Sequence, residues 1–184
     1  MDHAFTSARE RRLWLWALTV LVLIYATMGQ APEIAASFRE RSGLRIAGAI
    51  VLALAGLTIL LRWLRTRPRS AEVAVAIAVV AAYTMAWARI DSFEERTHLF
   101  EYGVVAVLAH MALTERGAPL WKSALATTGA VAMLGIIDEL VQLVLPGRVF
   151  DLRDIGFNLF AVFAAVGARM AVLWARRRRA SRDL

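Results

Sequence analysis

The stretch that decides the fold, residues 135–160, reads GIIDELVQLVLPGRVFDLRDIGFNLF. Two apolar runs meet there at Pro146-Gly147, a pair that marks a turn between helices. A charged side chain inside a bilayer is costly unless protein or water surrounds it, yet this segment carries carboxylates, amides and arginines. We therefore expect two helices joined by a turn, with their polar side chains facing the interior of a helix bundle.

The composition of the whole chain is that of an integral membrane protein. Hydrophobic residues make up 59% of its 184 residues and the mean hydropathy is +0.56, whereas soluble domains contain roughly 45–50% apolar residues. The formal charge is +7, but the basic residues lie at the ends of apolar runs, so we expect no nucleic-acid partner. Without cysteine there is no disulfide, thiol nucleophile or thiolate metal site.

Six apolar runs are long enough to cross a membrane. A helix rises about 1.5 Å per residue and the hydrocarbon core is about 30 Å thick, so a span needs about 17–25 residues. Backbone groups in lipid must pair internally, so runs of this length form helices. The expected fold class is all-α, a polytopic transmembrane bundle of about six spans. These spans are residues 12–30, 44–64, 71–90, 97–113, 120–145 and 154–175.

The distribution of positive charge predicts the orientation. Fourteen Lys and Arg residues fall on the side of both termini and seven on the other side, while Arg169 lies within the last span. Because positively charged loops stay cytoplasmic, both termini are expected in the cytoplasm. We divide the chain into an N-terminal two-helix membrane region (1–70), a transmembrane core (71–176) and a basic cytoplasmic tail (177–184).

Polar residues of the fourth and fifth spans fall at one depth near the expected outer surface. His98, Glu101 and Tyr102 have the spacing i, i+3 and i+4, which places them on one face of a helix. Asp138 and Glu139 are two adjacent carboxylates near the end of the next helix, with no Lys or Arg one turn away. This pair is the sharpest local signal, because no neighbouring cation explains it.

The turn and the last span add polar residues at the same depth. Gln142 lies one turn beyond Asp138, and Asp151, Asp154 and Asn158 form one stripe at the start of the last helix. Arg148 lies between the two groups in sequence. We expect all these side chains to line one outward-facing pocket.

Several of these residues also have a structural interpretation. Asp151 and Asp154 can cap the last helix and interact with the positive end of its dipole. Arg153 can neutralise a neighbouring carboxylate, as can the arginine of the turn. His98 can be a hydrogen-bonded interior histidine, and Tyr102 can belong to the aromatic belt at the membrane surface.

The motif ERTHLFEYGVVA (95–106), followed by DELVQLVLPGRVFDLRDIGFNLFAVFAAVG (138–167), resembles the VanZ-like membrane protein family. The family pattern has a His and a downstream Tyr on one helix, then an acidic residue and Gln, a Pro-Gly-Arg turn, and Asp followed by Asn on the last helix. The resemblance covers roughly residues 94–167. Many members carry a Lys three residues before the His, where this chain has Glu95 with Arg96 beside it. The matching positions are His98, Tyr102, Glu139, Gln142, Arg148, Asp151, Asp154 and Asn158.

The resemblance implies a multi-pass protein of the bacterial plasma membrane. The family's namesake is associated with reduced susceptibility to the antibiotic teicoplanin, but family or fold alone does not assign an activity. The residues themselves favour handling of a lipid-linked or phosphate-bearing substrate of the cell envelope. His98 with Glu139 or Asp138 would act as acid and base, whether or not the protein is an enzyme. Substrate binding is expected from Tyr102, Glu101, Gln142, Arg148, Asp151, Asp154 and Asn158, of which Arg148 suits phosphate.

Other functions stay open at this point. The polar cluster can be a structural network in a scaffold or binding protein. A small transporter is a third hypothesis, against which we count an absence of polar residues in the inner halves of these helices. Membrane lipids are expected partners and no cofactor is expected, although an oxygen-rich set can hold Mg²⁺ or Ca²⁺. The sequence does not reveal the oligomeric state.

Overall fold

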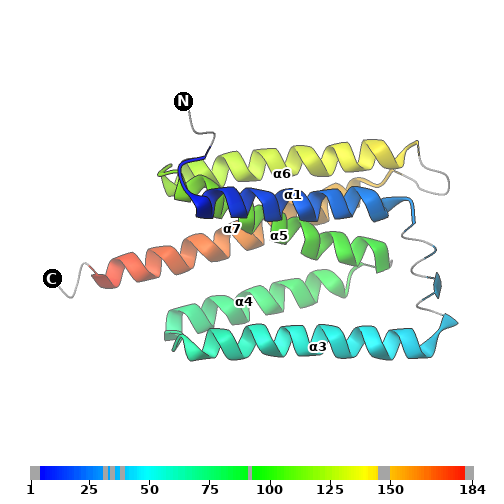
Figure 1. Ribbon diagram of the computed structural model, residues 1–184, viewed down its shortest axis with the longest axis horizontal. Coiled ribbons are helices and arrows are strands. Elements are labelled where there is room, and N and C mark those ends of the chain that lie inside the picture. Colours follow the sequence, from blue (N-terminus) through cyan, green and yellow to red (C-terminus); the bar gives the residue numbers. More distant parts are fainter. Residues whose placement is uncertain are drawn as a thin grey trace.

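The computed structural model describes residues 5–30, 33, 36–37, 40–90, 93–144 and 150–180. Within these ranges the chain forms helices and no strand, which confirms the all-α fold class. The start of the first helix and the end of the last lie at the same end of the bundle, which we call the terminal end (Figure 1). The helices are α1 (Ala8–Met28), α3 (Ser42–Arg65), α4 (Ser70–Trp87), α5 (Phe93–Glu115), α6 (Leu120–Gln142) and α7 (Leu152–Ala180).

Helix α5 is the central element of the bundle. It contacts α1, α6 and α7, while α7 also contacts α4 and α6. Helix α3 lies at the edge of the arrangement (Figure 1). Three different neighbours therefore contact α5. This position accounts for its polar sequence, because protein replaces lipid around it.

The core is built around one face of α5. Leu99, Tyr102 and Ala106 are fully buried at helical spacing, and they pack with Ile24 of α1 and Val162 of α7. Lipid is as apolar as these side chains, so close van der Waals packing, rather than exclusion of water, holds such helices together. Small residues such as Ala106 allow the neighbouring backbones to approach α5 closely.

Four of the described helices meet both criteria for a membrane span, namely sufficient length and low polarity. They are α1, α4, α6 and residues 152–177 of α7. Their outward surfaces are apolar, as shown by Val80, Leu125 and Met133, whose side chains are at least 63% exposed. Such surfaces suit contact with lipid. The count of six spans and the membrane side of the termini stay predictions.

Ion pairs tie the helices together at the terminal end. Glu10 of α1 is fully buried, and its Oε1 accepts a hydrogen bond of 2.8 Å from Nε of Arg116, just beyond α5. Nε of Arg176 in α7 donates to Oε1 of Glu72 in α4 at 2.7 Å. Gly117, with φ of +87°, makes the turn between α5 and α6, a conformation that glycine adopts without steric cost.

The contact between α6 and α7 requires a glycine. A Cβ placed at Gly135 would lie 3.2 Å from both Cβ and Nδ2 of Asn158, which is buried in α7. The same atom placed at Gly129, also in α6, would meet nothing within 4 Å. The two glycines therefore form a matched pair for a test of this contact.

We expect Gly135→Ala to destabilise the protein by about 1–3 kcal/mol, because an added methyl group overpacks a close helix contact. Gly129→Ala should be neutral or stabilise by up to about 1 kcal/mol, since alanine favours a helix more than glycine does. Unfolding of both variants in detergent micelles measures the difference. Equal stability of the two variants would contradict the close approach of α6 and α7.

Candidate functional site

A histidine and an aspartate form a buried pair between α5 and α6. Nδ1 of His98 lies 3.1 Å from Oδ2 of Asp138, which has no exposed surface, while His98 is 9% exposed. Glu101, one turn beyond His98, and Tyr102 both lie close enough to Asp138 to interact with it electrostatically. The helical spacing of the α5 residues thus brings an imidazole, a carboxyl group and a phenol to one carboxylate of α6.

The second carboxylate of α6 links α6 to the start of α7. Glu139 is fully buried, and its Oε2 accepts a hydrogen bond of 3.2 Å from the backbone N–H of Asp151. Its Oε1 lies 3.4 Å from Nε2 of Gln142, which donates to it. Glu139 therefore connects two segments on either side of the turn between these helices.

Asp151 caps the start of α7, as the structural interpretation of its sequence position predicted. It directly precedes α7, and its Oδ1 accepts a hydrogen bond of 2.8 Å from the backbone N–H of Arg153. This is the bond of a helix N-cap, which satisfies one of the otherwise unpaired N–H groups at the helix start. Asp154 is half-buried one turn before Asn158.

Asn158 and Tyr102 complete the cluster from two sides. Asn158 of α7 is 2% exposed and packs against Gly135 of α6. Tyr102 is fully buried, and its hydroxyl group donates to the carbonyl oxygen of Leu134 at 3.5 Å. A place for Tyr102 in the aromatic belt at the membrane surface is therefore wrong.

Helix α1 adds a residue that the sequence did not single out. The hydroxyl group of Tyr25 is buried, and Tyr25 interacts electrostatically with Asp138 and Tyr102. A tyrosine near the end of an apolar run looks like an interfacial aromatic residue, so this contact has no distinctive signal in the sequence. We define the polar cluster as the set from the four helices: Tyr25, His98, Glu101, Tyr102, Asp138, Glu139, Gln142, Asp151, Asp154 and Asn158.

The structure describes two of the arginines near these segments, Arg96 and Arg153, and both bind backbone carbonyl groups. Arg148 and the Pro146-Gly147 turn lie outside the described residues, so the role of Arg148 stays a prediction. The guanidinium group of Arg96 donates to the carbonyl oxygen of Ile90 at 3.0 and 2.8 Å and stacks on the ring of Trp87. Arg153 is exposed and donates to the carbonyl oxygen of Arg89 at 3.4 Å.

A second polar centre lies nearer the terminal end. His110 is fully buried in α5, with its Nε2 3.3 Å from the carbonyl oxygen of Leu120 and its Nδ1 in contact with the guanidinium group of Arg169. Arg169 also donates to Oγ1 of Thr114 at 2.9 Å. Our expectation that the inner halves of these helices carry no polar residue is therefore wrong. It no longer counts against a transporter.

Among the described residues, no group of three or more His, Asp or Glu side chains is arranged to hold a metal ion. No family model, curated protein or solved structure matches the chain. The resemblance to the VanZ-like family and the proposal of a divalent cation therefore stay predictions.

The buried pair between α5 and α6 makes a testable contribution to stability. We expect His98→Leu to cost about 3–5 kcal/mol, because it leaves the carboxyl group of Asp138 buried without its partner. The double variant His98→Leu/Asp138→Leu should regain most of this loss, since an apolar pair needs no partner. Unfolding of the parent protein and of both variants in detergent micelles measures these differences in stability. A single variant as stable as the double variant would show that the two side chains are not coupled.

Proposed function

We propose that the protein handles a lipid-linked or phosphate-bearing substrate of the bacterial cell envelope at the polar cluster, and that it belongs to the VanZ-like type. The single observation that supports this best is the set of buried polar atoms that converge without hydrogen-bond partners. Within the described part of the chain, they include Nδ2 of Asn158 in α7 and the hydroxyl group of Tyr25 in α1.

These atoms favour a binding site over a purely structural network. Buried polar groups in proteins are nearly always hydrogen-bonded, and a network that only joins helices is stabilising when each member has a partner. Here Asp138 pairs with His98 at 3.1 Å and can accept further donors, while Nδ2 of Asn158 and the hydroxyl group of Tyr25 have unused hydrogen-bonding capacity. Donors and acceptors from α1, α6 and α7 therefore point to a polar occupant, such as a headgroup.

The chemistry of the cluster suits acid and base work on such a headgroup. A histidine paired with a carboxylate can accept a proton at one moment and donate it at another. Glu139, held by Gln142 and by the N–H of Asp151, is a second carboxylate with a different hydrogen-bond environment. Arg148 follows α6 by six residues, and we assign it the role of binding the phosphate by paired hydrogen bonds.

A structural role is the second candidate, and burial is the observation that favours it. Asp138, Glu139, Gln142 and Asn158 are at most 2% exposed. If the cluster is only a scaffold, replacing one of its residues should lower the abundance of the protein in the membrane. Every phenotype should then fall in proportion to that abundance. A site that handles substrate would lose binding while the fold persists.

The outward orientation of the cluster can be tested because the chain has no native cysteine. Leu152 begins α7 beside the cluster and is 72% exposed, whereas Arg177 lies near the terminal end of the same helix and is exposed. We expect a membrane-impermeant maleimide to label Leu152→Cys in intact cells, and to label Arg177→Cys only after lysis. The reverse pattern would place the polar cluster on the cytoplasmic side.

Substrate handling can be separated from scaffolding by a binding measurement. The purified protein in nanodiscs should bind a radiolabelled polyprenyl phosphate saturably, and His98→Gln and Glu139→Gln should weaken that binding at least about tenfold, the effect of about 1.4 kcal/mol. His110→Gln is the matched control, because it replaces another fully buried histidine of α5 outside the cluster. No saturable binding, or equal binding by all variants that remain folded, would overturn the proposal.

A further inference from the structure

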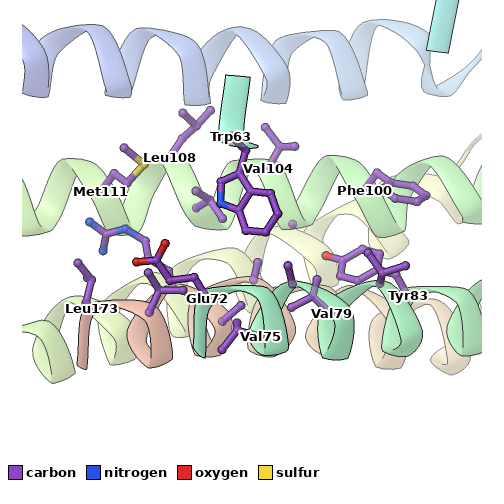
Figure 2. Close-up of a pocket in the computed structure, with 18 of the residues that line it drawn as sticks. Trp63, Glu72, Val75, Val79, Tyr83, Phe100, Val104, Leu108, Met111 and Leu173 are labelled. Carbon is purple, nitrogen blue, oxygen red and sulfur yellow. The ribbon is translucent and has the colours of Figure 1, made fainter. Parts of the chain in front are cut away.

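A long apolar groove runs between α4, α5 and α7, away from the polar cluster. Its volume is about 1080 Å³, which reaches the upper end of the about 300–1,000 Å³ typical of small-molecule sites. Figure 2 shows Phe100 and Tyr83 toward one end of the groove and Met111, Leu173 and Glu72 toward the other. Trp63 of α3 lies across its middle, close to Val104 (Figure 2).

The dimensions of the groove fit one acyl chain. Its wall on α4 extends from Glu72 to Trp87, which at about 1.5 Å per residue spans roughly 22 Å. Each leaflet contributes half of a hydrocarbon core about 30 Å thick, so the groove is longer than the acyl chain region of one leaflet. The lining between these two residues is mostly apolar, with Val75, Val79 and Val104 among its members, and the hydroxyl groups of Tyr83 and Thr84 donate to backbone carbonyl oxygens.

The charges of the lining lie near the terminal end. They belong to Arg169 and Arg176 of α7 and Glu72 of α4, so the lining carries one positive charge in excess. Arg176 is paired with Glu72. Among the described residues, Arg169 forms no ion pair with a carboxylate, and its contacts are the ring of His110 and the hydroxyl group of Thr114.

Arg169 donates to uncharged groups alone among these contacts, so a bound anion would stabilise its positive charge in the apolar groove. Arg169 lies seven residues before Arg176 on α7, so it is roughly 10 Å deeper in the bundle. A long arginine side chain at this depth can reach toward a lipid headgroup. The single surplus charge of the lining matches the single negative charge of a phosphodiester.

We infer that this groove binds a membrane phospholipid with an anionic headgroup, whose phosphate contacts Arg169 and whose acyl chain lies along α4, α5 and α7. The lipid enters from the leaflet at the terminal end. It is therefore a bound lipid distinct from the substrate proposed for the polar cluster, which lies at the other end of the bundle.

The position of Trp63 supplies the experiment. A full-length variant that keeps Trp63 and carries Phe in place of Trp14, Trp16, Trp87, Trp121 and Trp174 is reconstituted in phosphatidylcholine vesicles. Dibrominated phosphatidylglycerol or dibrominated phosphatidylcholine then replaces a rising fraction of the lipid, because bromine quenches a tryptophan that it contacts. We expect phosphatidylglycerol to reach half-maximal quenching at an about fivefold lower fraction, the size of effect expected when one basic residue attracts an anionic lipid.

Three further variants locate the effect. Arg169→Gln should abolish the preference for phosphatidylglycerol, whereas Arg169→Lys, which keeps the charge, should retain most of it. Arg177→Gln is the matched control, because it removes an equal charge from an exposed position outside the groove. Val79→Phe, which narrows the groove, should reduce quenching by both lipids.

Three results would overturn the proposal that the groove binds an anionic lipid. Equal quenching by the two brominated lipids in the parent protein overturns the proposal without reference to any variant, so a misfolded Arg169→Gln does not leave it undecided. A preference that Arg177→Gln abolishes and Arg169→Gln leaves intact also overturns it, since the basic surface then attracts the lipid. Strong quenching unaffected by Val79→Phe would place the lipid outside the groove.

Discussion

The structure depends on the enclosure of polar side chains by protein within a lipid solvent. Polar and charged groups in a bilayer persist when neighbouring helices surround them, and α5 is the helix for which this holds, since α1, α6 and α7 all contact it. Its two histidines, His98 and His110, are buried at positions twelve residues apart, roughly 18 Å along the axis. Each histidine meets a polar side chain of a different neighbour, Asp138 of α6 and Arg169 of α7. Helix α5, which carries both histidines, is thus enclosed by three neighbours, and both polar centres are built on it.

Much of this arrangement follows from the sequence. The apolar runs predicted the described helices to within a few residues, because a span must cover the hydrocarbon core and Pro or Gly interrupts the chain between spans. Helical spacing also placed His98, Glu101 and Tyr102 on one face, and the two adjacent carboxylates identified the part of α6 that meets it. Asp138 and Glu139 lacked a cation one turn away in sequence, and each has a partner on another element, His98 for Asp138 and the backbone N–H of Asp151 for Glu139.

The remaining contacts depend on which helix faces meet, and local sequence does not encode that. Tyr25 lies in an apolar run where an aromatic residue has no distinctive signal, yet it contacts the cluster from α1. Arg169 was recognisable as a charge inside a span, but its partner His110 is 59 residues away in sequence. Arg96 lies beside Glu95, the position at which many VanZ-like proteins carry a Lys. Its guanidinium group donates to the carbonyl oxygen of Ile90 and not to the polar cluster. For Tyr25 and Arg169 the partner belongs to a segment that only the fold brings close.

Helix α5 also separates two surfaces of different chemistry. Tyr102 faces the polar cluster, whereas its neighbours Gly103 and Val104 line the apolar groove. A Cβ at Gly103 would collide with the hydroxyl group of Tyr83 on α4, which is placed to donate to the carbonyl oxygen of Ala161 at 3.5 Å. The absence of a side chain at Gly103 therefore allows α4 to close against α5 and α7, while the preceding tyrosine is held on the other side. A larger residue at that position would displace the hydroxyl group of Tyr83, which lines the groove, whereas the bond between Glu139 and Asp151 involves neither α4 nor α5. The two surfaces share one helix without sharing their supporting contacts, so a lipid in the groove and a substrate at the cluster can be bound independently.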